Sequence, residues 1–285
     1  MNFYLSAILL GLGFSFLAMG IFVSMRIFNI PDITTDGSFT LGGAVTAILL
    51  MNGNHSLIVL PVAFIAGAIA GALTGLIHTR LKVNSLLSGI LVMTALYSIN
   101  LGIMGKSNIP LIGINTIFHI SGVSEFQSQF IILTFFTVFV FVVLSLLLKT
   151  DFGLAMRATG NNETMMSSLG VNTTSMKIAG LALANGLTAV SGYFICQVQG
   201  FGDIGMGIGI VILGLGSVMI GEIFLKLFKK SSITLNILAV IFGAIIFRII
   251  LAFALSIGVN ALYLKLVVAL LVLIVVSIPN LKKSQ

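Results

Sequence analysis

The stretch KTDFGLAMRATGNNETMMSSLGVNTTS, residues 149–175, is a polar interruption of 27 residues in a chain built mainly from apolar runs. Only 7% of the 285 residues are charged and 58% are hydrophobic, with a mean hydropathy of +1.21. A soluble domain needs charge at about a quarter of its positions. Most of this chain is therefore surrounded by lipid, and we predict an all-α, polytopic integral membrane protein.

Apolar runs of about 20 residues locate the membrane-spanning helices. Eight long runs fall near residues 3–25, 56–78, 85–105, 128–148, 176–199, 204–224, 232–256 and 263–279. The first run lacks a basic region before it, so we interpret it as a retained helix rather than a signal peptide. A ninth run, 38–51, extends only about 21 Å as a helix, short of the ~30 Å hydrocarbon core. It is either half of a broken helix or a span completed by the preceding loop. The prediction is a single membrane domain, residues 1–285, with about eight or nine helices, and the side of its N-terminus stays open.

The basic residues lie between the apolar runs, where topology signals occur, and do not form a nucleic-acid-binding face. Alternating the long runs places the connections 79–84, 149–175 and 225–231 and the C-terminal tail on one side. These segments carry Arg80, Lys82, Lys149, Arg157, Lys226, Lys229, Lys230, Lys282 and Lys283. The opposite connections carry only Lys106. The positive-inside rule makes the first side, with the C-terminus, cytoplasmic.

A weak internal repeat links PDITTDGSFTLGGAV, residues 31–45, with GDIGMGIGIVILGLG, residues 202–216. Both share an Asp-Ile pair, a turn rich in small residues and a small-residue helix start. Many transporters are built from such repeats, with interrupted helices beside the substrate route. We predict a first repeat over about 1–105 and a second over about 176–285, against the alternative that Gly-rich membrane helices look alike by chance.

Charged residues inside apolar segments are costly and mark either a pathway or a structural ion pair. Asp36 can act as a plain helix N-cap, or it can join neighbouring polar residues that line a pathway beside a broken helix. Glu222, near the cytoplasmic end of its helix, can snorkel or face the Lys226 region, and Arg248 is expected to face protein or a water-filled cavity. The candidate pathway residues are Asp32, Thr34, Thr35, Asp36, Ser38, Asp203 and Glu222.

The remaining motifs point to packing rather than to chemistry. Gly67, Gly71 and Gly75 share one helical face that lets another helix approach closely, and packing within one subunit is favoured over a subunit interface. The sequence contains no P-loop, no nucleophile elbow and no His or Cys pattern with metal-ligand spacing. We therefore expect no catalytic residue, no metal site and no enzyme activity.

The polar interruption itself predicts a short capped helix. Asn161 or Asn162 can serve as the N-cap, and Glu163 in the first turn suits the helix dipole. Gly170 is placed to end the helix in a left-handed conformation. An apolar stripe at positions i, i+1 and i+4 is formed by Met165, Met166 and Leu169. Because Met is adaptable at binding surfaces, a docking element is favoured over a helix resting on lipid headgroups.

The segment TDFGLAMRATGNNETMMSSLGVNTTSMKIAGLALANGLTAVSG, residues 150–192, resembles the coupling-loop region of ABC importer permeases of the branched-chain amino acid and ribose type. The shared pattern falls on Gly153, Arg157, Ala158, Gly160, Asn162, Glu163 and Gly170. The likeness extends to FNIPDITTDGSFTLGGA, SGILVMTALYSINLGIMGKSNIPL and GMGIGIVILGLGSVMIGE, and so covers nearly the whole chain. It is most similar to permeases paired with tryptophan/tyrosine-type binding proteins. The pair Asn161-Asn162 and the short N-terminus depart from the usual pattern.

This resemblance implies a permease subunit of the bacterial cytoplasmic (inner) membrane. Such a subunit would pair with a second copy or a paralogue, dock two ABC ATPase subunits, and receive a small solute, an amino acid or related compound, from an extracytoplasmic binding protein. The coupling helix would be 161–170, with Arg157 and Gly160 before it. The chain would bind no cofactor, since Mg-ATP would bind in the partner ATPase. The alternative is an ion-coupled secondary carrier, and a non-transporting scaffold would leave the polar repeat regions unexplained.

Overall fold

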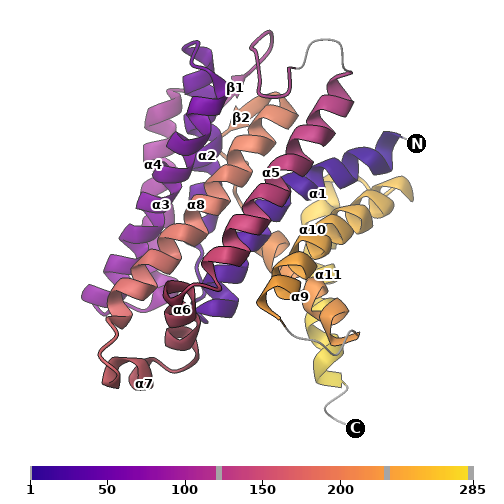
Figure 1. Ribbon diagram of the computed structural model, residues 1–285. Helices are drawn as coiled ribbons and strands as arrows, with labels where there is room; N and C mark the ends of the chain where they lie inside the picture. Colours follow the sequence, from indigo (N-terminus) through magenta and orange to yellow (C-terminus); the bar gives the residue numbers. More distant parts are fainter. Residues whose placement is uncertain (1, 120–123, 228–231, 282–285) are drawn as a thin grey trace.

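The structure is a computed structural model that describes residues 2–119, 124–227 and 232–281 (Figure 1). Its first half contains α1 (Asn2–Ile21), a π-helical end η1 (Phe22–Ile27), α2 (Thr34–Met51), α3 (Ser56–Arg80), α4 (Ser85–Met104), β1 (Asn108–Pro110) and α5 (Glu125–Leu147). Its second half contains α6 (Asp151–Asn161), α7 (Glu163–Ser168), α8 (Thr173–Gln199), β2 (Phe201–Asp203), α9 (Ile210–Leu227), α10 (Ile233–Ser256), η2 (Ala261–Tyr263) and α11 (Leu264–Leu281). The all-α prediction is confirmed, with one short antiparallel ribbon, β1–β2, added to it.

Six helices in the described part of the chain are long and apolar enough to cross a membrane. They are α1 with η1, α3, α4, α5, α8 and α10, and they match six of the eight long runs. Two shorter apolar helices, α9 and α11, match the other two. The run expected to be helical from residue 204 is corrected, because 204–209 forms turns and the helix begins at Ile210. The protein is therefore a multi-pass membrane protein.

The short run at 38–51 belongs to α2, which begins inside the protein. The Thr34 hydroxyl lies 2.7 Å from that of Thr74, which is about 9 Å along the axis of α3 from its end at Arg80. From there the 18 residues of α2 run for about 27 Å toward the opposite end of the bundle. The region is a partial span whose first turn is enclosed by protein.

Two long helices form the centre of the molecule. In their apolar windows α1 is 83% buried and α8 is 78% buried, whereas α5 is only 22% buried. The helices α1 and α8 pack on each other; α1 also lies along α10, and α8 lies along α3. Helices from the first and second halves of the chain thus pack on each other in the core. The outer helices α3, α4, α5 and α11 leave large apolar side chains exposed for contact with lipid.

The glycine stripe of α3 lies within this core. A Cβ added at Gly67 would come within 2.5 Å of the Asn185 carbonyl oxygen, and one at Gly71 would overlap the carbonyl oxygen of Leu181. Both of these oxygens belong to α8. The stripe therefore serves close packing of α3 on α8 within one subunit, which confirms the interpretation favoured from the sequence.

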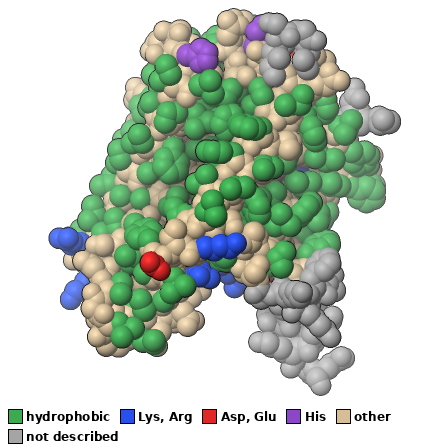
Figure 2. All heavy atoms as spheres, in the orientation of Figure 1, with side chains coloured by type: hydrophobic (Ala, Val, Ile, Leu, Met, Phe, Trp, Pro, Cys, Tyr) green, Lys and Arg blue, Asp and Glu red, His purple; other side chains and the backbone are tan. Residues whose placement is uncertain are grey.

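Most of the described basic residues lie at one end of the bundle. Figure 2 shows Lys and Arg side chains gathered toward the end occupied by α6 and α7 in Figure 1, with His side chains toward the other. We call the former the basic end; the α3–α4 connection also lies there, and β1, β2 and the loop after β1 lie at the opposite end. Four lysines used to predict the orientation, Lys229, Lys230, Lys282 and Lys283, are outside the described residues.

Candidate functional site

The polar interruption folds into two helices rather than the single one expected from the sequence. The additional helix, α6, starts where the Thr150 hydroxyl accepts a hydrogen bond from the Gly153 amide at 3.3 Å. Its buried residues, Gly153, Met156 and Thr159, are three apart and so form one face. This face packs on η1, on α8 and on the end of α5, so α6 anchors the interruption to the membrane helices.

The second helix, α7, has the caps that the sequence predicts. The Asn162 side chain accepts a hydrogen bond from the Met165 amide at 3.0 Å, and Glu163 occupies the first turn. Gly170 adopts φ +82°, and the Val171 amide donates to the Met166 carbonyl oxygen at 3.1 Å. A left-handed glycine followed by such a bond is the usual way to end a helix. Asn161, the other candidate cap, is instead the last residue of α6.

The apolar stripe of α7 divides into exposed and half-buried members. Met165 is 58% exposed and Leu169 is 66% exposed, whereas Met166 is half-buried. Large apolar side chains on a six-residue helix that buries none of its own residues do little for the stability of this chain. The exposed side chains of Met165 and Leu169 form a small apolar surface at the basic end, which we call the α7 face.

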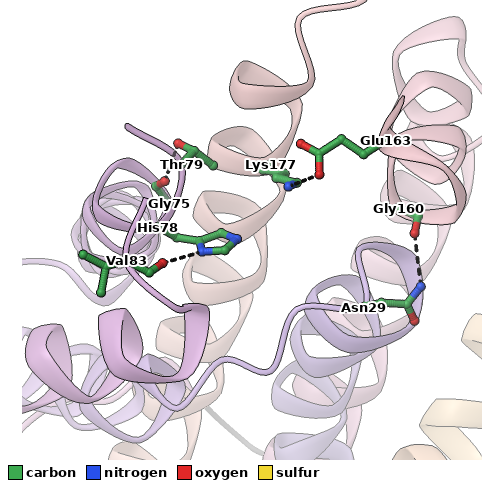
Figure 3. A network of polar contacts seen from close by, with 8 residues as sticks. All are labelled: Asn29, Gly75, His78, Thr79, Val83, Gly160, Glu163 and Lys177. Atoms are coloured by element: carbon green, nitrogen blue, oxygen red, sulfur yellow. Dashed lines mark hydrogen bonds and ion pairs between the residues drawn. The ribbon is translucent and has the colours of Figure 1, made fainter. Parts of the chain in front are cut away.

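An ion pair holds α7 against α8. The Lys177 ammonium donates a hydrogen bond to the Glu163 carboxylate at 2.5 Å, as Figure 3 shows. This hydrogen bond, followed by the positive charge of Lys177, lowers the pKa of Glu163 below its ordinary value. Glu163 was predicted for its effect on the helix dipole; its contact with Lys177 depends on how α7 folds back onto α8 and was not predicted.

The end of α6 is wedged under the end of the first helix. The Asn29 side-chain amide donates to the Gly160 carbonyl oxygen at 3.1 Å (Figure 3). A Cβ at Gly160 would overlap the carbonyl oxygen of Ile27, so only glycine allows this approach. Asn29 has φ +54°, a left-handed conformation that Asn adopts more readily than most residues. Arg157, one turn before Gly160, is half-buried, and its Nε donates no hydrogen bond.

The chain after Asn29 leads directly into a buried polar cluster at the start of α2. The Asp32 carboxylate accepts hydrogen bonds from the Thr34 amide at 2.9 Å and from the Asn185 side-chain amide at 2.6 Å. The side-chain oxygen of Asn185 accepts a hydrogen bond from the Ser38 hydroxyl at 2.7 Å. The Thr35 hydroxyl donates to the Asp32 backbone carbonyl oxygen at 3.2 Å. All of these side chains are buried. The cluster joins the N-terminus of α2 to the middle of α8.

Asp36 stabilises a helix other than the one expected. The Asp36 carboxylate accepts hydrogen bonds from the Gly209 amide at 2.8 Å and the Val211 amide at 2.9 Å, at the N-terminus of α9. Of the two alternatives for Asp36, capping of its own helix is wrong, because Asp32 is the residue that binds the first amide of α2. A carboxylate at the N-terminus of α9 satisfies free amides and complements the helix dipole.

The last two candidate pathway residues lie at opposite ends of the molecule. Asp203 accepts from the Asn108 side-chain amide at 3.1 Å and from the Gly205 amide at 2.8 Å, in the β1–β2 ribbon. Glu222 forms an ion pair with Arg26 of η1, and the side chains of the Lys226 region are outside the described residues. The seven candidates therefore occupy the start of α2, the ribbon and the basic end, and the structure does not bring them onto one surface.

Three residues of this arrangement were not identified from the sequence. Asn185 places a polar amide inside an apolar helix. Because burial of an amide is costly unless it is hydrogen-bonded, its position could have indicated a buried polar contact. Arg26 stands at the end of the first apolar run, and Asn29 follows it. No group of three or more His, Cys, Asp or Glu residues that could hold a metal ion occurs in the part of the chain that the structure describes.

Comparison with known proteins finds transport permeases that match nearly the whole chain. A family described as "Branched-chain amino acid transport system / permease component" matches residues 3–277. A tyrosine transport system permease protein of Clostridioides difficile is 40% identical over 95% of this chain and 89% of its own length. An uncharacterized protein of Rickettsia prowazekii is 34% identical, covering 94% of each chain. A probable branched-chain amino acid transport permease of Methanocaldococcus jannaschii is 27% identical, over 64% of this chain and 62% of its own. No solved structure matches the chain.

Proposed function

Because the chain belongs to the permease family of branched-chain amino acid transport systems, we propose that it is the membrane subunit of an ATP-driven importer for an amino acid. Membership of this family makes it a transport subunit and not an enzyme. The relative named as a tyrosine permease supports an aromatic amino acid as the solute. In this proposal an extracytoplasmic binding protein delivers the solute at the ribbon end, and specificity depends mainly on that protein.

The observation that carries the proposal is the exposed α7 face. A capped helix at the basic end presents two apolar side chains and buries none of its residues in the chain itself. Helix caps and the Lys177 ion pair fix the position of this face before a partner binds, and such preorganisation lowers the cost of association. We assign the basic end to the cytoplasm and the α7 face to an ATPase subunit, which would hold Mg-ATP while this chain binds no cofactor.

The contacts behind α7 suggest how movement of the ATPase reaches the membrane helices. A displacement of α6 acts on Ile27 and Asn29 through Gly160, because that contact leaves no free space. Asn29 is three residues from Asp32, whose cluster sets the position of the α2 N-terminus. From Asp36 the displacement passes to the N-terminus of α9. These packed contacts form a continuous route from α6, beside the α7 face, to α2 and α9.

The carrier alternative gains no support from the same residues. Asp32, Asp36 and Glu222 each bind a partner within the chain, so none is a free carboxylate available to bind an ion.

A second permease copy is also part of the proposal, since an importer of this kind has two halves around one route. ATP binding would favour one conformation of both halves through its different affinity for the two states.

A pair of variants tests docking and coupling separately. The tagged chain is expressed with the ATPase and binding-protein genes of its own transport system, purified in mild detergent, and reconstituted for transport. Met165→Asp combined with Leu169→Asp should lose the ATPase from the purified complex while still inserting into the membrane. Gly160→Ala should keep the ATPase but lose most transport, because the new Cβ pushes α6 away from Ile27. Gly102→Ala is the matched control, since a Cβ at Gly102 meets no atom within 4 Å.

Each outcome has a defined meaning. Recovery of the ATPase with the wild-type and Gly102→Ala chains but not with the double variant supports the docking role of α7. Normal transport by the double variant would refute that role. Uptake of a labelled aromatic amino acid that proceeds in vesicles without ATP, and without an ATPase in the complex, would refute the importer itself.

A further inference from the structure

Arg248 is a cation in a membrane-spanning helix without a carboxylate partner. All seven acidic residues of the chain lie in the described ranges, and the two ion pairs there are Arg26–Glu222 and Lys177–Glu163. The Arg248 Nε atom is enclosed and donates no hydrogen bond. An intramembrane guanidinium is costly unless an anion and hydrogen-bond acceptors compensate it. Within the described residues, no carboxylate pairs with Arg248 and its Nε atom has no acceptor.

One side of the guanidinium is covered by an aromatic ring. Its central carbon lies 3.7 Å from the centroid of the Phe14 ring, and Phe14 stacks in turn on Phe39 of α2, with 5.7 Å between centroids. A cation–π contact orients the side chain and offsets part of the desolvation cost, but it supplies no acceptor for the N–H groups. The ring therefore holds the planar group in place but does not neutralise its charge.

Arg248 also lines a cavity of about 290 Å³ between α1, α9, α10 and α11. Apart from Arg248 and Ser6, the lining is apolar and includes Ala7, Leu10, Leu255 and Val268. A cavity with a single cation and hydrocarbon walls matches a ligand with an anionic head and an apolar body. It contains no carboxylate to accept the ammonium group of an amino acid, so a zwitterionic solute is the poorer match.

Arg248 lies about two helical turns from one end of α10. Arg248 lies eight residues, or about 12 Å, before the end of α10 at Ser256, where the Tyr4 and Ser256 hydroxyls are 3.3 Å apart. This end of α10 is the end away from α6 and α7. An arginine side chain this close to the end of a membrane helix can reach toward a lipid headgroup while its stem stays in an apolar environment.

We propose that this cavity binds an anionic amphiphile, with its phosphate or carboxylate paired to Arg248 and its hydrocarbon chain against the apolar lining. A guanidinium presents two parallel N–H groups to such a head, and a bound anion would supply the missing counter-charge. The ligand is a phospholipid of the surrounding leaflet or a free fatty acid, which share this chemistry. The inference rests on Arg248 and the cavity between α1, α9, α10 and α11, and does not depend on the proposed transport function.

The test uses the full chain purified in detergent and stripped of lipid. Phosphatidylglycerol, phosphatidylcholine, oleate and tyrosine are each titrated, and bound ligand is followed by native mass spectrometry and by the melting temperature. Phosphatidylglycerol or oleate should bind and raise the melting temperature by several degrees, and phosphatidylcholine should do so much less. The stronger of the two anions identifies the source.

Variants connect the effect to Arg248. In Arg248→Met, affinity for the anion should fall by at least about tenfold, since a buried charge-assisted pair is removed. Arg248→Lys should retain part of it, because it keeps the charge without the planar pair of donors. Arg80→Met is the control, since Arg80 is an exposed cation at the basic end. Equal binding of phosphatidylglycerol and phosphatidylcholine by the wild type, or stabilisation by tyrosine alone, would overturn the proposal.

Discussion

At the residue scale, Asn185 is the most consequential polar side chain in the core. Its amide nitrogen binds the Asp32 carboxylate, its oxygen accepts from Ser38, and it also donates to the Leu181 carbonyl of its own helix at 3.0 Å. One side chain thus satisfies groups from two helices that are far apart in sequence. Buried polar networks of this kind are stabilising only while every member is satisfied.

Replacement of Asn185 by Leu should therefore destabilise the chain by about 2–4 kcal/mol, because Asp32 loses a charge-assisted hydrogen bond and stays buried. The measurement is the melting temperature in detergent, with Thr94→Val as the control, since exposed Thr94 bonds only to the Ile90 carbonyl of its own helix. Replacing Asp32 as well should recover part of the loss. A single Asn185→Leu variant that melts with the wild type would contradict this account.

At the scale of elements, α7 is a short helix whose position depends on contacts outside it. Six residues cannot form a stable helix alone. Asn162 and Gly170 define its ends, and the Glu163–Lys177 pair holds it to α8. Because Glu163 forms the ion pair with Lys177 only when its carboxyl group is charged, the position of α7 depends on pH.

The pKa of Glu163 is lowered in the folded chain from an ordinary value of 4.5. The ion pair therefore contributes its full stabilisation above about pH 4.5, and the contribution is lost as the pH falls through the lower folded pKa. Hydrogen exchange at the α7 amides, corrected for intrinsic rates, should show less protection at pH 4 than at pH 7. Glu163→Gln should have low protection at both pH values. A wild-type profile without this dependence would show that the pair does not position α7.

At the scale of the whole molecule, α9 is held at both ends by the N-terminal helices. Its first turn binds Asp36 of α2, and Glu222 near its other end pairs with Arg26 of η1. The β2–α9 connection runs back along α2, with Met206 packed near Gly43 and Gly207 near Asp36. Movement of the α1–α2 region is therefore expected to carry α9 with it.

Reversal of the Arg26–Glu222 pair tests this coupling. Arg26→Glu or Glu222→Arg alone places like charges together and should reduce transport by the assembled importer about two- to fivefold, as expected for a partly exposed pair. The double reversal should restore most of the activity. Transport rates in proteoliposomes are the readout, and additive losses in the double variant would mean that the two residues act independently.

Features that depend on local chemistry could be predicted from the sequence. Composition established the membrane class, apolar run length located six spans, and the order of cap, acidic residue, apolar stripe and glycine predicted α7 with its ends. These signals are read correctly because caps, left-handed glycine positions and hydrophobic length involve residues close together in the chain. The proposed repeat and the pathway assignment of the polar residues stay predictions.

The partner of each polar residue depends on tertiary packing. Capping of its own helix was one of two alternatives for Asp36, which binds α9 instead; the partner of Glu222 was left open and is Arg26. The contact of Gly160 with Ile27 joins segments more than 100 residues apart. The physical reason is that in a membrane each buried polar group must find a partner wherever the packed helices place one. That geometry is set by the packing of α1, α2 and α8, which no local pattern contains.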